Sequence, residues 1–174
     1  MGSLKTVYSK EAIQERVETL GREVSERYRD AAEPVVAVCV LKGAFMFFAD
    51  LVRCLDFDPE LDFVRLASYG QDTISQGKVL FSKDMEVSVQ GKHVLIVEDI
   101  IDTGYTAQYL TKVLSARNPR SIAFCALVDK ASRREVDIEI DFVGFSLEGG
   151  FIVGYGLDYA ENYRQLSSIC ELTA

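Results

Sequence analysis

A continuous run of apolar, mostly β-branched residues, VVAVCVL at Val35–Leu41, constrains the fold of this chain more than any other feature. Such a run is typical of a strand covered on both faces, because a strand with one face in water alternates apolar and polar residues. Further strands are predicted at 62–68, 78–82, 93–97, 121–129 and 142–146. Strands that alternate with helical patterns favour an α/β fold with a mainly parallel central sheet flanked by helices.

Three helices are predicted, at 9–29, 44–55 and 103–116. The first has Ser9 as its N-cap, and its apolar residues recur at three- and four-residue steps, as one buried helix face requires. The third is stopped by Asn118-Pro119, since the residue before a proline disfavours helix. The polar segment GQDTISQGK at 70–78 lies between two strands and is predicted to be a mobile lid loop.

The length of 174 residues predicts one domain, spanning residues 1–174. A net charge of −8 disfavours nucleic-acid binding, which needs a basic surface. No apolar run is long enough to cross a membrane and no secretory signal is visible, so we expect a cytoplasmic protein without a membrane partner. The four cysteines are widely spaced, which favours reduced thiols over a disulfide framework or a zinc site.

Three acids crowd the end of one predicted strand, in VLIVEDIIDTG at Val94–Gly104. Ligands of parallel sheets gather at the carboxyl ends of strands, where the backbone amides of the next helix (Thr103–Thr106) would form a phosphate cradle. The carboxylates of Glu98, Asp99 and Asp102 could accept hydrogen bonds from sugar hydroxyls or bind Mg²⁺. These residues therefore indicate a site for a ribose phosphate with magnesium. The alternative interpretation is a set of solvated acids that cap a helix.

The same segment resembles the 5-phosphoribosyl 1-diphosphate (PRPP) signature of type I phosphoribosyltransferases, and EDIIDTG is most similar to the hypoxanthine-guanine branch. Other segments resemble that family in the family's own order and cover nearly the whole chain: LKGAFMFFADL at 41–51, SYG at 68–70, LVDK at 127–130 and DFVGFSLEGGFIVGYGLDYAENYRQL at 141–166. The resemblance implies the type I phosphoribosyltransferase fold, with a small base-binding hood and a mobile loop. It implies transfer of the phosphoribosyl group from PRPP to hypoxanthine or guanine, releasing pyrophosphate.

The resemblance also assigns roles to single residues. Asp102 would be the general base that faces N7 of the purine, a role within the chemistry of a carboxylate. Glu98 and Asp99 would hold the ribose hydroxyls, directly or through Mg²⁺, and Asp158 would bind a second Mg²⁺. The remaining implied contacts are Lys42, Gly43 and Arg164 for pyrophosphate, Thr103, Gly104, Tyr105 and Thr106 for the 5′-phosphate, Lys130, Phe151 and Ile152 for the base, and Ser68 and Tyr69 beneath the lid.

Several of these residues would be interpreted differently without the resemblance. Lys42 and Lys130 would be solvated lysines after strands, and Arg164 an exposed arginine. Phe151 and Ile152 would belong to another core strand. The resemblance implies that Lys130 donates a hydrogen bond to the purine 6-oxo group. Such a donor selects 6-oxopurines over adenine, whose 6-amino group is itself a donor. The resemblance further implies a cis peptide before Lys42.

We therefore expect a Mg²⁺-dependent enzyme of purine salvage that forms a homo-oligomer, either a dimer or a tetramer. The alternative is an RNA-binding attenuation regulator that keeps the phosphoribosyltransferase fold. Such a regulator needs a basic surface, which the net charge of −8 disfavours. The single histidine, His93, matches no implied role and is predicted to be structural.

Overall fold

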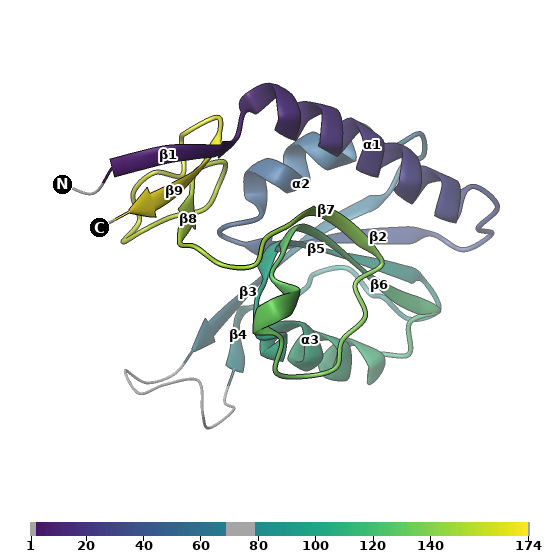
Figure 1. Ribbon diagram of the computed structural model, residues 1–174. Coiled ribbons are helices and arrows are strands. Elements are labelled where there is room, and N and C mark those ends of the chain that lie inside the picture. The colour runs from purple at the N-terminus through teal and green to yellow at the C-terminus, as the bar shows by residue number, and fades with distance from the viewer. Residues whose placement is uncertain (1–2, 69–78, 174) are drawn as a thin grey trace.

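The computed structural model describes residues 3–68 and 79–173. Its centre is a six-stranded sheet in the order β4-β3-β2-β5-β6-β7 (Figure 1). Its strands are β2 (Val35–Leu41), β3 (Glu60–Ser68), β4 (Val79–Lys83), β5 (His93–Ile101), β6 (Ser121–Asp129) and β7 (Phe142–Ser146). Every neighbouring pair is parallel except β3 with the edge strand β4. The predicted mainly parallel α/β sheet is confirmed.

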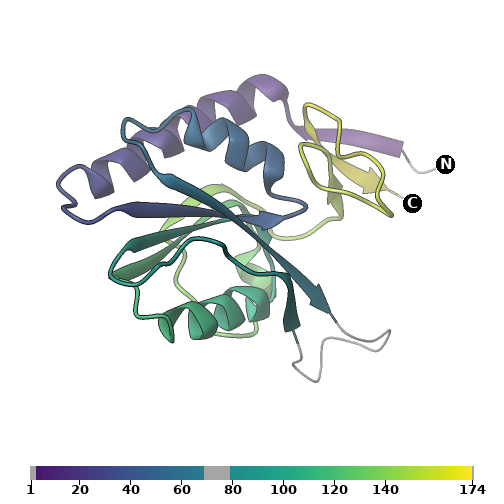
Figure 2. The ribbon, with the colours of Figure 1, turned by 180° about the vertical axis from the view of Figure 1, so that it is seen from behind.

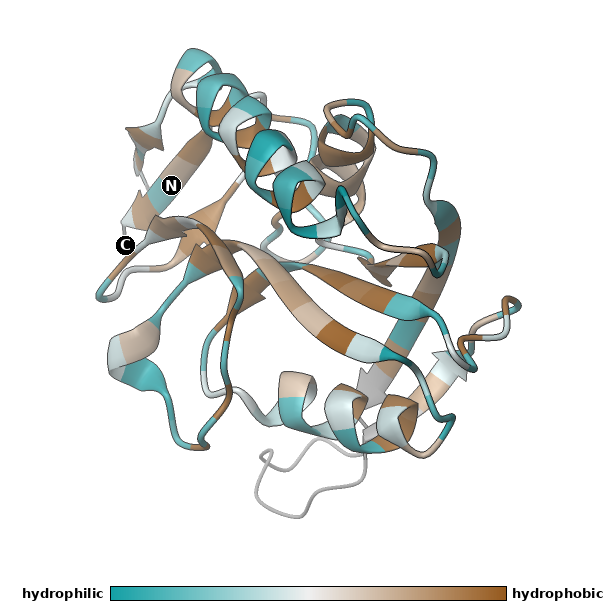
Figure 3. Cartoon of the chain, turned by 90° about the vertical axis from the view of Figure 1, so that its right-hand side faces the viewer, coloured by the Kyte–Doolittle hydropathy of each residue, from teal (hydrophilic) through white to brown (hydrophobic). Residues whose placement is uncertain are grey.

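Helices cover both faces of this sheet, as Figures 1 and 2 show. The helices α1 (Lys10–Tyr28) and α2 (Phe45–Val52) lie on one face, and α3 (Tyr105–Ser115) lies on the other. The predicted N-cap is confirmed, because the Ser9 hydroxyl accepts a hydrogen bond of 3.2 Å from the amide of Ala12. Figure 3 shows apolar residues along the strands and on the helix sides that meet them. The sheet thus separates two cores, one beneath α1 and α2 and one above α3.

A second, three-stranded antiparallel sheet was not predicted in this form. It has the order β1-β9-β8 and consists of β1 (Ser3–Tyr8), β8 (Ile152–Val153) and β9 (Ile169–Thr173). We call β1 together with residues 150–173 the hood. The hood lies beyond the carboxyl ends of the parallel strands, and both ends of the described chain belong to it (Figure 1). This arrangement leaves a site between the sheet and the hood.

The ends of β5 and α2 differ most from the prediction. Strand β5 continues to Ile101 instead of ending at residue 97, because Ile100 and Ile101 still pair with β6. Helix α2 ends at Val52 instead of residue 55, where a tighter turn directs the Cys54 amide to the Leu51 carbonyl. Cys54 packs there against α1.

The predicted lid loop at 70–78 lies outside the described residues, and so does Tyr69. The backbone of Ser68 ends β3. No helix within the described part of the chain is long and apolar enough to span a membrane.

Candidate active site

The crowded acids lie at the carboxyl end of β5, between the sheet and the hood. The extension of β5 places Glu98 and Asp99 within the strand instead of in the loop that follows it. Glu98 is buried, and burial together with the charge of Asp99 raises its pKa well above the ordinary value. Burial raises the pKa of Asp99 to about 6, although its Oδ1 accepts a hydrogen bond of 2.8 Å from the Ile100 amide. Two acids are thus held at this strand end where water solvates them poorly.

The turn after β2 lies directly against these acids. The peptide between Leu41 and Lys42 is cis, as the resemblance implied. A Cβ added to Gly43 would lie 1.6 Å from Oδ2 of Asp99, so the backbone and the carboxylate are in close approach. The φ angle of Gly43 is not positive, so its backbone conformation does not require glycine. The lack of space for a Cβ does. The ends of β2 and β5 therefore form one continuous wall of the site.

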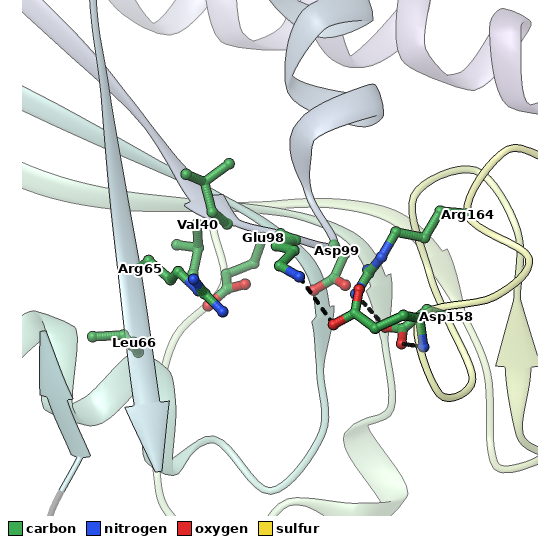
Figure 4. A pocket seen from close by; sticks show the side chains of 11 residues that line it. Val40, Arg65, Leu66, Glu98, Asp99, Asp158 and Arg164 are labelled. Carbon is green, nitrogen blue, oxygen red and sulfur yellow. Dashed lines mark hydrogen bonds and ion pairs between the residues drawn. The ribbon is translucent and has the colours of Figure 1, made fainter. Parts of the chain in front are cut away.

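A loop of the hood brings charged side chains to this wall. Arg164 donates to the Gly156 carbonyl at 2.8 Å and forms an ion pair of 2.8 Å with Asp158. Figure 4 shows Asp158 and Arg164 facing Asp99 across the site, with Arg65 entering from β3. These residues line a pocket of about 310 Å³. Its other lining residues are Val40, Leu41, Lys42, Gly43, Leu66, Glu98 and Glu161.

The N-terminus of α3 borders the same edge of the sheet. Gly104 is the N-cap in the left-handed conformation, with φ of 90°, and α3 begins at Tyr105. The first four amides of a helix have no intrahelical acceptor and lie at the positive end of its dipole. The preceding Thr103 is fixed by its carbonyl, which accepts a hydrogen bond of 3.0 Å from the Glu135 amide. The predicted turn from Thr103 to Thr106 thus has the backbone that an anion site requires.

Asp102 and Lys130 lie together on the other side of this turn. Arg133 Nε is 3.1 Å from Asp102 Oδ1, but the contact lacks hydrogen-bond alignment, so this buried oxygen has no donor among the described residues. Arg134 Nε donates to the Asp102 carbonyl at 3.0 Å and fixes the backbone. Lys130 is buried, and its Nζ donates to the Gly150 carbonyl at 2.8 Å. Burial lowers the pKa of Lys130, against the opposing effect of the Asp102 charge.

Phe151 and Ile152 extend this side of the site into the hood. The Phe151 ring is half exposed and makes an edge contact with Tyr159, with ring centroids 5.5 Å apart. Ile152 is buried in β8, where it pairs with Glu171. An exposed ring next to a buried strand can stack on a planar ligand while backbone groups contact the ligand's edge.

Carboxylates of the site could also serve as ligands of magnesium. No group of three His, Cys, Asp or Glu side chains among the described residues is arranged to hold a metal ion. Glu98, Asp99 and Asp158 nevertheless line one pocket, and burial leaves the first two acids with raised pKa values. Mg²⁺ commonly binds through one or two carboxylates while water and substrate phosphates complete its shell. The oxygen donors therefore fit Mg²⁺ that arrives together with a phosphate ligand.

The structure adds several residues that the sequence did not point to. Glu161 and Arg65 line the pocket, and Arg133 and Arg134 contact Asp102. Their only sequence signal was charge, which is the usual state of a surface residue. The structure places His93 at the opposite end of β5, where its Nδ1 lies 2.7 Å from the Ser121 hydroxyl, in agreement with a structural role.

Known proteins resemble this chain along nearly its whole length. Residues 3–160 match the family model described as phosphoribosyl transferase domain. A hypoxanthine phosphoribosyltransferase of Salmonella typhimurium is 47% identical over 154 residues, covering 88% of this chain and 86% of that protein. A hypoxanthine-guanine phosphoribosyltransferase of Bacillus subtilis is 47% identical over 165 residues, covering 95% and 91%. The crystal structure of a Staphylococcus aureus hypoxanthine phosphoribosyltransferase superposes with a TM-score of 0.92 at 39% identity, covering 97% and 91%.

Proposed function

Because this chain belongs to the hypoxanthine-guanine branch of the phosphoribosyltransferase family, we propose that it transfers the 5-phosphoribosyl group of PRPP to hypoxanthine or guanine. The products would be IMP or GMP and pyrophosphate. The chain is thus a pentosyltransferase of purine salvage. One observation best supports this choice of substrates: two different half-sites lie at the carboxyl ends of the parallel strands. In the first, acids lie beside Lys42 and Gly43, and in the second, Asp102 lies beside Lys130.

The first half-site suits PRPP. Lys42 and Arg164 would supply cations for the diphosphate. Because Gly43 has no side chain, the backbone of this turn could approach the diphosphate closely. The amides from Thr103 to Thr106 at the start of α3 would take the 5′-phosphate. Glu98 and Asp99 would accept hydrogen bonds from the ribose hydroxyls. The phosphoribosyl group would then be held at both ends with its C1 directed toward the second half-site.

The second half-site suits a 6-oxopurine. Lys130 would donate to the 6-oxo group, replacing its present bond to the Gly150 carbonyl. Phe151 would stack on the base, and the Ile152 backbone would contact the base edge. Adenine has a donor at position 6, so the Lys130 ammonium would oppose it. Ser68 and Tyr69 would form the base of the lid that excludes water.

Asp102 would act as the general base. The bond from ribose C1 to pyrophosphate breaks through a cation-like state as purine N9 forms the new bond, and N7 loses its proton. The buried Oδ1 of Asp102 has no hydrogen-bond donor among the described residues, so an N7–H group would satisfy it. The carboxylate would take that proton and would also stabilise positive charge on the sugar.

Mg²⁺ would be held by Glu98, Asp99 and Asp158 together with substrate oxygens. When bound, it would neutralise charge on the diphosphate leaving group. A bound cation would favour the ionised form of Glu98 and Asp99, whose pKa values burial raises in the absence of a cation.

We further propose a cytoplasmic homo-oligomer. All four cysteines are free, as expected in a reducing compartment. Phe45 of α2 and Leu61 and Phe63 of β3 are exposed large apolar residues that a second copy could cover. Sedimentation of the purified chain would test this proposal, and a monomer at micromolar concentration would contradict it.

The enzymatic proposal is tested with purified protein, PRPP, Mg²⁺ and each purine base. Formation of IMP from hypoxanthine and of GMP from guanine is expected, with no AMP from adenine. The proposal fails if neither 6-oxopurine is consumed. Binding of RNA without turnover would favour the regulator instead.

A further inference from the structure

The side chain of Glu161 bridges the two cations that the diphosphate is proposed to use. Its Oε1 accepts a hydrogen bond of 2.9 Å from Lys42 Nζ, and its Oε2 accepts one of 3.2 Å from Arg164. Lys42 follows β2 and Arg164 belongs to the hood, so this one carboxylate links the two sides of the pocket. No role was assigned to Glu161 from the sequence.

The backbone around Glu161 is arranged to present this carboxylate. Ala160 and Glu161 both have positive φ, of 50° and 65°, which non-glycine residues adopt rarely. The Glu161 amide donates to Asp158 Oδ2 at 2.8 Å, and Tyr159 and Asn162 bridge the base of the turn. The turn therefore directs Glu161 toward Lys42.

The bridge itself is exposed and hence exchangeable. The side chain of Glu161 is 66% exposed and that of Lys42 is 44% exposed. Lys42 and Arg164 hold the pKa of Glu161 below its ordinary value, so the carboxylate is ionised at neutral pH. An exposed ion pair contributes little to stability, far less than a diphosphate bound to two cations can gain. An incoming diphosphate can therefore replace Glu161 on both cations.

We propose that the Glu161 carboxylate takes the place of pyrophosphate in the empty site. It binds Lys42 and Arg164 there, is displaced by the diphosphate of the substrate, and binds both cations again as the product leaves. This inference rests on the proposed function and names a residue that tunes release of its product. The lining agrees with it: Glu98, Asp99 and Asp158 are matched in number by the cations Lys42, Arg65 and Arg164, so the carboxylate of Glu161 gives the pocket an excess of acidic groups and weakens its attraction for an anion. Glu161 is thus a residue that regulates affinity and makes no contact with the reacting atoms.

The test compares Glu161→Gln with Glu139→Gln in the full-length chain. Glu139 is also exposed and loses the same charge, but it does not line the pocket. Calorimetry with pyrophosphate and Mg²⁺ should show about two- to tenfold tighter binding to Glu161→Gln than to wild type, the range expected from two exposed ion pairs. Glu139→Gln should bind like wild type.

Steady-state kinetics adds a readout that a merely structural role would not change in this direction. Glu161→Gln should lower KM for PRPP without raising kcat, and pyrophosphate should inhibit it more strongly. A higher KM for PRPP, or pyrophosphate affinity equal to that of Glu139→Gln, overturns the inference. Glu161→Asp, whose side chain is shorter by one methylene, should give an intermediate affinity and replaces the glutamine variant if that one does not fold.

The failure of this inference is distinguishable from failure of the proposed function. If wild-type protein makes neither IMP nor GMP, the proposed function fails. If wild type is active and the two glutamine variants behave alike, only the role of Glu161 fails.

Discussion

At the scale of single residues, Asp102 has a buried carboxylate oxygen without a hydrogen-bond donor among the described residues. If that oxygen takes the N7 proton, Asp102→Asn should slow transfer by about 10² to 10⁴, the range typical of a lost acid–base group. PRPP binding should stay unchanged, because Asp102 lies on the base side of the turn. Single-turnover kinetics and PRPP calorimetry measure the two effects separately.

The matched control for this variant is Asp137→Asn. Asp137 is exposed and lies on the segment that follows Arg134. It should keep wild-type turnover. Wild-type turnover in Asp102→Asn as well would remove Asp102 from the role of general base.

Asp99 gives a second prediction at this scale, concerning stability and pH. Its pKa is raised from 3.8 to about 6 by burial, so the folded protein binds this proton more tightly than the unfolded chain does. The associated stability is complete below pH 3.8 and is lost as the pH rises through about 6. Asp99→Asn should therefore stabilise the ligand-free protein at pH 8 by roughly 1–3 kcal/mol, at 1.36 kcal/mol for each pKa unit.

The measurement is urea unfolding of wild type and Asp99→Asn at pH 8 and at pH 4.5. The difference in the free energy of unfolding should be clearly smaller at pH 4.5, where the Asp99 carboxyl of the folded protein is mostly protonated. An equal difference at both pH values would show that ionisation of Asp99 does not cause it.

The residues of the site differ in how well the sequence predicted them. Asp99, Asp102 and Lys42 lie in segments where acids or a lysine follow a buried strand, so their positions follow from the order of strands. Glu161 and Arg133 could not be predicted, because their contacts depend on how loops distant in sequence fold back onto the site. Local periodicity contains no information about such contacts.

At the scale of elements, the turn between β2 and α2 depends on the size of one residue. A Cβ on Gly43 would lie 1.6 Å from Oδ2 of Asp99, so Gly43→Ala must displace either the turn or the acid. We expect kcat/KM for PRPP to fall by about 10- to 100-fold, the order of effect that a displacement of 1 Å produces. The temperature of thermal unfolding should change little, since Gly43 and Asp99 lie at the carboxyl ends of β2 and β5 and not in the middle of the sheet. Kinetics with varied PRPP and a melting curve measure the two quantities.

Gly149→Ala is the control for that substitution. Nothing lies within 4 Å of a Cβ added to Gly149, and its φ is not in the left-handed region. It should keep wild-type kinetics. Equal losses in both variants would indicate a general effect of replacing glycine near the hood, and not the contact with Asp99.

Elements with strong periodicity were predicted well, whereas strands β1 and β9 of the hood were not. The long amphipathic helix α1 and the apolar strands β2 and β6 follow directly from their sequences. Strands β1 and β9 were missed, because β1 is largely exposed, β9 is short, and the two strands pair from opposite ends of the chain. Such pairing is a property of the tertiary fold and leaves little trace in local sequence.

At the scale of the whole molecule, the two ends of the described chain meet in the hood. Strand β1 pairs with β9 from Ser3 with Thr173 to Tyr8 with Ile169, and β9 pairs with β8, which holds Ile152. The PRPP half-site is built mainly from the ends of β2 and β5 and from α3, outside this sheet. The three-stranded sheet therefore supports the base contacts at Phe151 and Ile152, whereas Arg164 and Asp158 of the PRPP half-site lie in a hood loop outside that sheet.

Removal of residues 2–8 should weaken the base contacts more than the PRPP contacts. Without β1 the edge of β9 is unpaired, β8 is held less firmly, and the base contacts at Phe151 and Ile152 should loosen. We expect KM for hypoxanthine to rise about tenfold, equivalent to ~1.4 kcal/mol of binding free energy, while PRPP affinity stays close to wild type. Removal of Gly2 alone is the control and should change neither value. Equal losses of purine and PRPP affinity would mean that the hood supports the whole site, because Arg164 and Asp158 also belong to it.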